Sequence, residues 1–452
     1  MKMKCLAVAL TMSLGLSVIP AQATDLTDIY RLALENDPRL LRAAADRDSA
    51  KAGVDVSRAD WWPQINLGVN YSDSKSDGVN TTDDGFVVRT TNTTSFSQEV
   101  SLSQTVFNLG TWRATGITEK QAYQAEVNYL LARQQLMLRV TNAYFTVLQA
   151  QDNLEFVQAE KRAIERQLEQ TKHRFSVGLT AITDVHEAQA QFDNAVAQEI
   201  QAQNRVEIAL EGLREITGRQ HADIFRLNTE RFEPVRPDPQ GVERWIQLAH
   251  DRNLQLLISR SGLEIAEQRI ELARAGHYPR VSLNASYSNR DQDTSSAAGS
   301  RNVSGLNSRN IGLQLTLPLY SGGRTVASTE QARADYVSVS QTLEENRRLV
   351  EREVRSAYFD VVASISSIRA FEQAVISAES ALNATQVGLE VGTRTIVDVL
   401  QSTRNLFNAR RNLSEARYTY VNRILALYQA AGIISESDLL TINDGLVAPQ
   451  SQ

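Results

Sequence analysis

The sequence predicts a mainly α-helical fold with a smaller β component, built from two copies of one structural unit. Three observations in the 452-residue chain lead to this prediction. A short motif and its surroundings occur twice. Each copy carries two stretches in which apolar and polar residues alternate, which predicts strands. Each copy also has a segment of about 60 residues without glycine or proline, which predicts a very long helix.

The duplication is clearest in two ten-residue strings. Residues 177–186 read VGLTAITDVH and residues 391–400 read VGTRTIVDVL, with the same residue at five of the ten positions. The same offset of 214 residues relates AYF at 143–145 to AYF at 357–359. A register kept over so long a distance indicates duplication of the whole unit rather than a chance motif.

The repeats divide the chain into four parts. The basic start MKMK, a short apolar stretch and the small residues Ala21-Gln22-Ala23 are typical of a signal peptide, which we expect at 1–23. Repeat 1 is expected at 24–230, an inter-repeat linker at 231–241 and repeat 2 at 242–452. The exported chain would then begin at repeat 1.

Composition excludes several classes of function. Cys5 is the only cysteine and lies in the expected signal peptide, so the exported chain should use no thiol for disulfides, metal binding or catalysis. The net charge is −6, without long runs of one sign, so a nucleic-acid partner is not expected, because phosphate binding needs a basic face. No apolar run of about 18 residues follows the signal peptide, so no transmembrane helix is expected.

Each repeat should begin with a helical segment, at roughly 26–59 and 242–275, in which apolar residues recur at helical spacing. The first strands follow at about 63–73 and 279–289. There, apolar side chains occupy every second position over eight residues, which is the pattern of a half-buried strand.

Polar stretches rich in Ser, Asp, Asn and Gly come next, and we expect them to form long hydrophilic loops. Return strands are expected at about 95–107 and 310–320. A hairpin with a long polar loop is typical of an outer-membrane barrel segment. A sheet in a soluble sandwich explains the alternation of the strands equally well.

The long helices favour the first interpretation. Residues 117–177 and 324–387 contain neither glycine nor proline and would form helices roughly 90 to 95 Å long. Each should stop at the repeated glycine motif and turn back as a helical hairpin. The expected helices are 113–177 and 181–216 in repeat 1, and 324–388 and 395–431 in repeat 2, followed by a C-terminal segment at 432–452.

Four strands per chain are too few to close a transmembrane barrel, which needs about eight, and open sheet edges cannot face lipid. The chain must therefore oligomerise, and its copies would pool their hairpins into one barrel and their helices into one tube. Such an assembly has a pore in the outer membrane that continues as a tunnel across the periplasm.

The order of parts, the duplication and the strings VGLTAITDV and VGTRTIVDVL resemble the TolC family, the outer-membrane channels of efflux pumps and type I secretion. The resemblance covers essentially the whole exported chain. It implies a homotrimer with a 12-strand transmembrane β-barrel, four strands per protomer, continued by a long periplasmic α-helical barrel. An equatorial region would include residues near 217–240 and the C-terminal segment 432–452. The resemblance also implies a passive duct, docked by a periplasmic adaptor protein to an inner-membrane pump or ABC exporter, with no cofactor.

The resemblance places a periplasmic gate at the hairpin tips. Arg394 on one hairpin corresponds to a family residue that bonds to the positions of Thr183 and Asp184 on another. Leu389 stands where the family has a tyrosine, so one hydrogen bond of that lock is expected to be absent. The tips themselves are expected to dock the adaptor, through Val177, Gly178, Leu179, Val391, Gly392 and Thr393.

The resemblance also implies a constriction ring. Asp398 corresponds to one of two family aspartates at the narrowest point, and Gln401 replaces the other. Two plainer interpretations stay open: Asp398 forms a helix capping box with Thr395, and Arg394 is a solvated loop cation.

Two other classes of protein stay open. A trimeric surface adhesin or structural envelope protein would also combine strands with long helices, but its anchoring strands are expected at the C-terminus. A periplasmic enzyme needs a convergent catalytic set, and none is visible. The five histidines are scattered without ligand spacing, so we expect neither a metal site nor a catalytic site.

Overall fold

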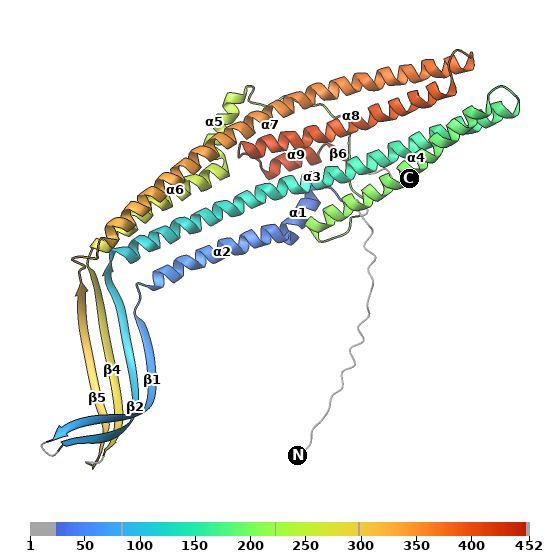
Figure 1. Cartoon of the computed structure of the whole chain (residues 1–452). Coiled ribbons are helices and arrows are strands. Elements are labelled where there is room, and N and C mark those ends of the chain that lie inside the picture. Colours follow the sequence, from blue (N-terminus) through green and yellow to red (C-terminus); the bar gives the residue numbers. More distant parts are fainter. Residues whose placement is uncertain (1–23, 83–84, 222, 297–298, 449–452) are drawn as a thin grey trace, which may run out of the picture.

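The chain is elongated, with long strands at one end and the tips of two helical hairpins at the other (Figure 1). The structure, a computed structural model, describes residues 24–82, 85–221, 223–296 and 299–448. The expected signal peptide and the last four residues of the expected C-terminal segment lie outside the described residues.

The elements follow one another in the same order in both halves of the chain, apart from short additions near the middle and the C-terminus. In repeat 1 they are α1 (Leu26–Asn36), α2 (Pro38–Ala59), β1 (Gln64–Thr82), β2 (Gly85–Asn108), α3 (Leu109–Ser176), α4 (Ile182–Thr217) and β3 (Arg226–Leu227). In repeat 2 they are α5 (Val242–Arg252), α6 (Leu254–Arg274), the 3₁₀ turn Ala275–His277, β4 (Arg280–Ser296), β5 (Gly299–Thr316), α7 (Arg324–Glu390), α8 (Ile396–Ala430), α9 (Glu436–Asn443) and β6 (Leu446–Val447).

Four long strands form one antiparallel sheet in the order β1-β2-β4-β5. The two hairpins therefore lie side by side, with β2 of repeat 1 paired to β4 of repeat 2. Alternation places Ile65, Leu67, Val69 and Tyr71 on one face of β1, where each is between 61% and 71% exposed. No element of the same chain covers this apolar face among the described residues.

The expectation that the polar stretches at 72–85 and 288–309 form long hydrophilic loops is wrong, because most of their described residues belong to strands. The ladder of β1 and β2 runs without interruption from the pair Gln64–Ser103 to the pair Thr82–Gly85. Backbone hydrogen bonds form a ladder whatever the side chains, and polar cross-strand contacts add to it, such as the 2.6 Å hydrogen bond that Thr90 donates to Asp77. The hairpins are therefore longer than their apolar alternation indicates.

The fourth strand also differs from its expected bounds. It begins at Gly299 rather than 310 and ends at Thr316, before the expected end at 320. Pro318 has no N–H to give to a ladder, and Leu319, which is 90% exposed, already belongs to the turn that leads into α7.

The helical segments expected at 26–59 and 242–275 are each two helices. Asp37 ends α1 and caps α2, since its carboxylate accepts the N–H of Leu40 at 2.8 Å, and Pro38 occupies the first position of α2. Asn253 plays the same part between α5 and α6, where it accepts the N–H of Leu256 at 3.1 Å. Side-chain capping therefore breaks each segment at equivalent places.

The long helices form two hairpins, α3 with α4 and α7 with α8, of 68, 36, 67 and 35 residues. Figure 1 shows them extending side by side, with α2 along α3 and α6 along α7. The main apolar core lies around the middle of their length and includes Tyr144, Phe145, Trp245 and Leu425, all at most 1% exposed. The hairpin ends carry much less apolar packing.

A belt crosses the helices halfway along their length. The short strands β3 and β6 pair there, with Arg226 opposite Val447 and Leu227 opposite Leu446. The inter-repeat linker is fixed to α8, because the hydroxyl of Tyr420 donates to the carbonyl of Val235 and accepts its N–H, both at 2.9 Å. These contacts lie in the part of the chain where the equatorial region is expected. In the described part of the chain, no helix has both the length and the apolarity to cross a membrane.

Candidate functional site at the hairpin tips

The turn between α3 and α4 is set by one glycine. Gly178 has a φ of +77°, which favours glycine, and follows the last residues of α3. The N–H of Leu179 donates to the carbonyl of Arg174 at 2.8 Å, and that of Gly178 donates to Phe175 at 2.9 Å. This is the double hydrogen bond of a Schellman helix end. Val177 and Leu179 are left 57% and 69% exposed at the tip.

The turn between α7 and α8 repeats this geometry. Gly392 has a φ of +79°, the N–H of Thr393 donates to Gly388 at 2.8 Å, and that of Gly392 donates to Leu389 at 3.3 Å. Val391 is 68% exposed, and its counterpart Val177 is 57% exposed. The repeated sequence string is thus a repeated turn, which presents an exposed apolar side chain and an exposed glycine at each tip.

The two turns differ where the second helix begins. Thr395 caps α8 in a complete capping box: its backbone N–H and its hydroxyl both donate to Asp398 at 2.9 Å, and its hydroxyl accepts the N–H of Asp398 at 3.3 Å. In α4 the equivalent cap position is Ala181, which has no side-chain acceptor, and Thr180 donates to Asp184 instead. The capping role expected for Asp398 is therefore confirmed.

Asp398 is ionised at neutral pH. The Thr395 backbone N–H, then the Thr395 hydroxyl and the nearby charge of Arg394, hold the pKa of this carboxyl below its ordinary value. A capping residue that keeps its charge can also contribute negative charge to a pore. The cap and the expected ring are therefore compatible.

Arg394 lies at the very tip, and its stem crosses the end of α7. A Cβ atom at Gly388 would lie 2.7 Å from Cγ of Arg394, so this close approach requires glycine. Among the described residues of one chain, no hydrogen bond or ion pair joins Arg394 to Thr183 or Asp184. One chain by itself does not assemble the expected lock.

Leu389 packs against a small apolar cluster instead of making the hydrogen bond of a tyrosine. The cluster joins α3, α4 and α8 near the tips, through Ile164, Leu168, Ala188, Ala195, Ile396 and Leu400. It is the apolar contact between the two hairpins at this end. Its side chains are few, and two of them are alanines.

Gln401 lies one turn beyond Asp398 and is exposed. It donates to Asn405 at 2.9 Å and accepts a hydrogen bond from Arg404. A guanidinium thus lies beside the position where the family has its second aspartate. The sequence alone did not indicate this cation.

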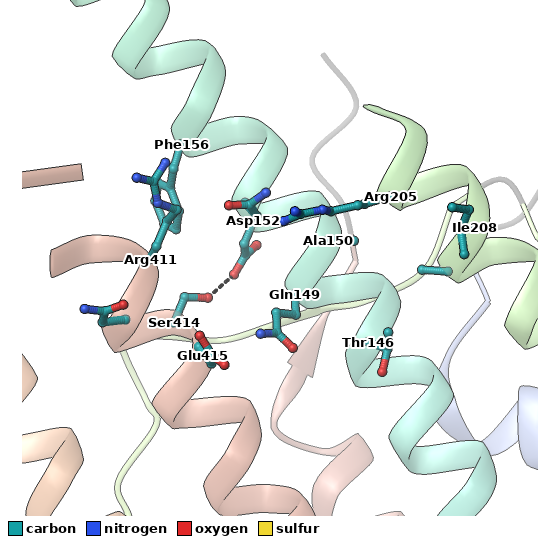
Figure 2. A pocket seen from close by; sticks show the side chains of 13 residues that line it. Thr146, Gln149, Ala150, Asp152, Phe156, Arg205, Ile208, Arg411, Ser414 and Glu415 are labelled. Carbon is teal, nitrogen blue, oxygen red and sulfur yellow. Dashed lines mark hydrogen bonds between the residues drawn. The ribbon is translucent and has the colours of Figure 1, made fainter. Parts of the chain in front are cut away.

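Further along the hairpins lies a polar groove of about 570 Å³ between α3, α4 and α8 (Figure 2). Asp152 of α3 borders it and accepts hydrogen bonds from Ser414 at 2.5 Å and Tyr418 at 2.8 Å, both from α8. Arg205 of α4 extends toward it in Figure 2. Burial raises the pKa of the Asp152 carboxyl, against the effect of these two donors.

A second carboxylate is buried between α3 and α8. Glu160 is 3% exposed and pairs with Arg411 at 3.1 Å. Burial raises the pKa of Glu160, although Arg411 and, more weakly, Arg404 lower it. Sequence reasoning missed these residues. The available indication was the spacing of Arg404, Arg411 and Tyr418, which are seven residues apart and therefore share one face of α8.

Comparison with known proteins gives one family. The model of the family described as outer membrane efflux protein matches residues 29–219 and 245–433. Outer membrane protein TolC of Vibrio cholerae is 44% identical over 445 residues, which cover 98% of each chain. TolC of Escherichia coli K12 is 39% identical, covering 99% of this chain and 90% of its own. The alkaline protease secretion protein AprF of Pseudomonas aeruginosa is 32% identical, covering 95% and 89%.

Solved structures show the same fold. The outer membrane protein VceC from Vibrio cholerae superposes with a TM-score of 0.72 at 21% identity, covering 90% of this chain and 96% of its own.

Proposed function

Since the chain belongs to the outer membrane efflux protein family, we infer that it is an outer-membrane exit duct that serves efflux pumps and type I protein secretion. Its relatives are named as outer membrane proteins and as a protease secretion protein. The family consists of channels, and we propose that this chain is likewise not an enzyme and needs no cofactor. Transport along a duct requires a shaped passage rather than reacting groups.

The observation that carries this proposal is the uncovered sheet. Its apolar face is exposed along β1 and again along β5, where Ile311, Leu313 and Leu315 are between 66% and 80% exposed. Its edge strands β1 and β5 have no further partner within the described chain. Both features fit a segment of a barrel in lipid, where edges must be paired and outward side chains must be apolar.

We propose that three copies close this barrel. Each chain supplies four strands, and pairing β5 of one copy with β1 of the next would give 12 strands and remove every edge. The four long helices of each copy would then form one periplasmic tube. The belt at mid-length would lie around that tube as the equatorial region.

The tips are proposed as the gate of the tube. In a trimer, we propose that Arg394 bonds to Thr183 and Asp184 of the neighbouring copy. This contact between copies would make the lock that one chain lacks. Leu389 contributes apolar packing to the tip cluster rather than a hydrogen bond. Asp398, from each copy, would form a ring of three carboxylates, and Gln401 would leave the second ring uncharged.

The hairpin tips also support a proposal for the partners of the duct. The exposed tip residues Val177, Leu179 and Val391, with the glycines Gly178 and Gly392 and the neighbouring Thr393, offer an apolar surface with accessible backbone. Such a surface suits a periplasmic adaptor protein, which would join the duct to an inner-membrane pump or an ABC exporter. We propose that the tips are its docking site.

Ion conductance tests the function. Purified protein added to a planar lipid bilayer is expected to give discrete conductance steps. An adhesin or a structural envelope protein, the alternative function, would bind its target or assemble without conducting. A protein that inserts as a trimer and never conducts would contradict the channel and favour that alternative.

A further inference from the structure

Contacts between the two hairpins of one chain follow a regular polar pattern. Arg404 Nη1 donates to Gln191 of α4 at 3.1 Å, and Arg411 Nη1 donates to Glu160 of α3 at 3.1 Å. One further interval of seven residues along α8, Tyr418 donates to Asp152 of α3 at 2.8 Å. We call this set the inter-hairpin seam: Asp152, Glu160 and Gln191 on the first hairpin, and Arg404, Arg411, Ser414 and Tyr418 on the second.

The ion pair of the seam is more buried than those inside each hairpin, of which Lys161 with Glu199 is the least exposed, at 27% and 15%. The side chain of Glu160 is 4% exposed and that of Arg411 is 22% exposed. Arg423 of the same helix pairs with Asp360 of α7 at 3.0 Å, but these side chains are 51% and 42% exposed. An exposed pair contributes little to stability, whereas removing one partner of a buried pair leaves an uncompensated charge.

Apolar packing between the hairpins is weak in the same region. The main core lies around the belt, and the tip cluster has six buried side chains, two of them alanines. The seam fills the length between them. Directional polar contacts therefore add to the attachment of α8 to α3 and α4 toward the tips, where a few apolar side chains such as Val157 and Leu406 are also buried.

The closed seam is not fully satisfied. Nε of Arg404 is buried without a hydrogen-bond partner among the described residues, and Glu160 is held in a poorly hydrated position. Both groups would regain hydration if the hairpins moved apart. The seam is thus attractive only in the closed geometry, and rehydration of these two groups offsets part of its loss when the hairpins separate, which suits an element with two discrete states.

We propose that Arg404 and Arg411 form a latch within each chain, which holds the α7–α8 hairpin against the α3–α4 hairpin and must break when the tips open. The latch is separate from the lock of Arg394 and lies about three to five helical turns deeper along the hairpin. It rests on the proposed function, because a latch acts only in a duct that opens. Gln191 and Glu160 are its receiving groups.

The test is conductance of purified trimers in planar bilayers. Arg411→Gln and Arg404→Gln should each raise the fraction of time spent in the open state, by about tenfold for Arg411, which corresponds to about 1.4 kcal/mol. Exchanging the charges, with Glu160→Arg and Arg411→Glu in one chain, should restore the closed state. Arg423→Gln is the matched control: it removes an α8 arginine of similar pairing distance whose partner belongs to the same hairpin.

The outcomes separate the latch from the channel. A wild-type protein that never conducts would overturn the proposed function. A conducting wild type with unchanged Arg411→Gln and Arg404→Gln trimers would overturn the latch alone. The latch would also be overturned if Arg423→Gln raised the open fraction as much as Arg411→Gln does. It would be overturned too if the charge exchange left the open fraction as high as in the single variants. If Arg411→Gln prevents trimer formation, the conductance of Arg404→Gln trimers tests the latch instead. The partner Gln191 is uncharged, so this variant leaves no unpaired charge behind.

Discussion

Asp398 is the residue in which a structural role and a transport role can be separated. Its capping box with Thr395 is present in one chain, whereas its ring needs three copies. Asn keeps a side-chain oxygen for the Thr395 donors but removes the charge. The variant Asp398→Asn therefore distinguishes a carboxylate that only caps a helix from one that also acts on ions.

We predict that the wild-type pore is cation-selective and that Asp398→Asn lowers this selectivity, because low-dielectric walls focus the field of the three carboxylates. Reversal potentials in a salt gradient measure the effect. Trivalent cations should block the wild type only weakly. Gln401→Asp should make trivalent cations block the pore more tightly. The block should be tighter still in the double variant with Arg404→Gln, because Arg404 would otherwise pair with the new carboxylate. Unchanged selectivity and block in Asp398→Asn would leave Asp398 as a cap only.

Arg394→Ser is predicted to raise the resting conductance. A surface ion pair contributes about 0.5 to 1 kcal/mol, so three equivalent locks in a trimer together contribute about 1.5 to 3 kcal/mol, which corresponds to about 10- to 150-fold in the closed-to-open ratio. Lys172→Ser is the control, since Lys172 is an exposed cation near the same tip that pairs with Glu169 on its own helix at 2.9 Å. Equal conductance of wild type and Arg394→Ser, with intact trimers, would assign Arg394 to a solvated loop.

At the scale of elements, the end of α7 positions the tip arginine. Gly388→Ala adds a methyl group where Cγ of Arg394 now lies 2.7 Å away, so the arginine stem must move. We predict that Gly388→Ala raises the resting conductance, as Arg394→Ser does. The rise should be smaller, because the charge of Arg394 is still present. Gly212→Ala is the control, because nothing lies within 4 Å of a Cβ there. Closed Gly388→Ala channels would show that the lock tolerates this shift.

The interface of α3 and α8 should respond to pH through Asp152. Groups that face it are Ser414, Tyr418, Arg226 and Glu155. Its folded-state pKa is raised by burial, so the folded protein binds the proton more tightly than the unfolded chain does. This residue therefore disfavours folding above its folded-state pKa, and that cost disappears as the pH falls toward the unfolded value near 3.9.

Asp152→Asn is accordingly predicted to raise the unfolding temperature at pH 7, with an advantage that shrinks as the pH approaches 4. The amide oxygen can still accept from Ser414 and Tyr418, and the amide nitrogen can border the groove. Calorimetry of trimers from pH 4 to pH 8 measures the difference. Asp28→Asn, at an exposed position of α1, is the control. A constant or growing difference at low pH would contradict the assigned direction.

At the scale of the whole molecule, closure of the sheet requires other copies. Detergent-purified protein is predicted to sediment as a trimer and to resist dissociation on heating, because 12 strands closed in a ring leave no edge to separate first. Analytical ultracentrifugation at several protein concentrations checks this. A monomer at all concentrations would contradict both the barrel and the tube.

Local sequence determined a large part of this protein. The helical hairpins could be predicted because absence of glycine and proline permits long helices, and a glycine at a fixed place ends them with a Schellman turn, as at Gly178 and Gly392. The capping box could also be predicted from local sequence, because Thr395 and Asp398 are only three residues apart. The alternation in the first strands identified their apolar face.

Tertiary structure decided what depends on partners distant in the chain. The strands continue through polar sequence because their hydrogen bonds come from the neighbouring backbone, which side-chain polarity does not report. Glu160 meets Arg411 across 251 residues, and Asp152 meets Tyr418 across 266. Such pairs form only when α8 packs on α3. Periodicity could place Arg404, Arg411 and Tyr418 on one face of α8, but only the packing of the two hairpins set carboxylates against that face.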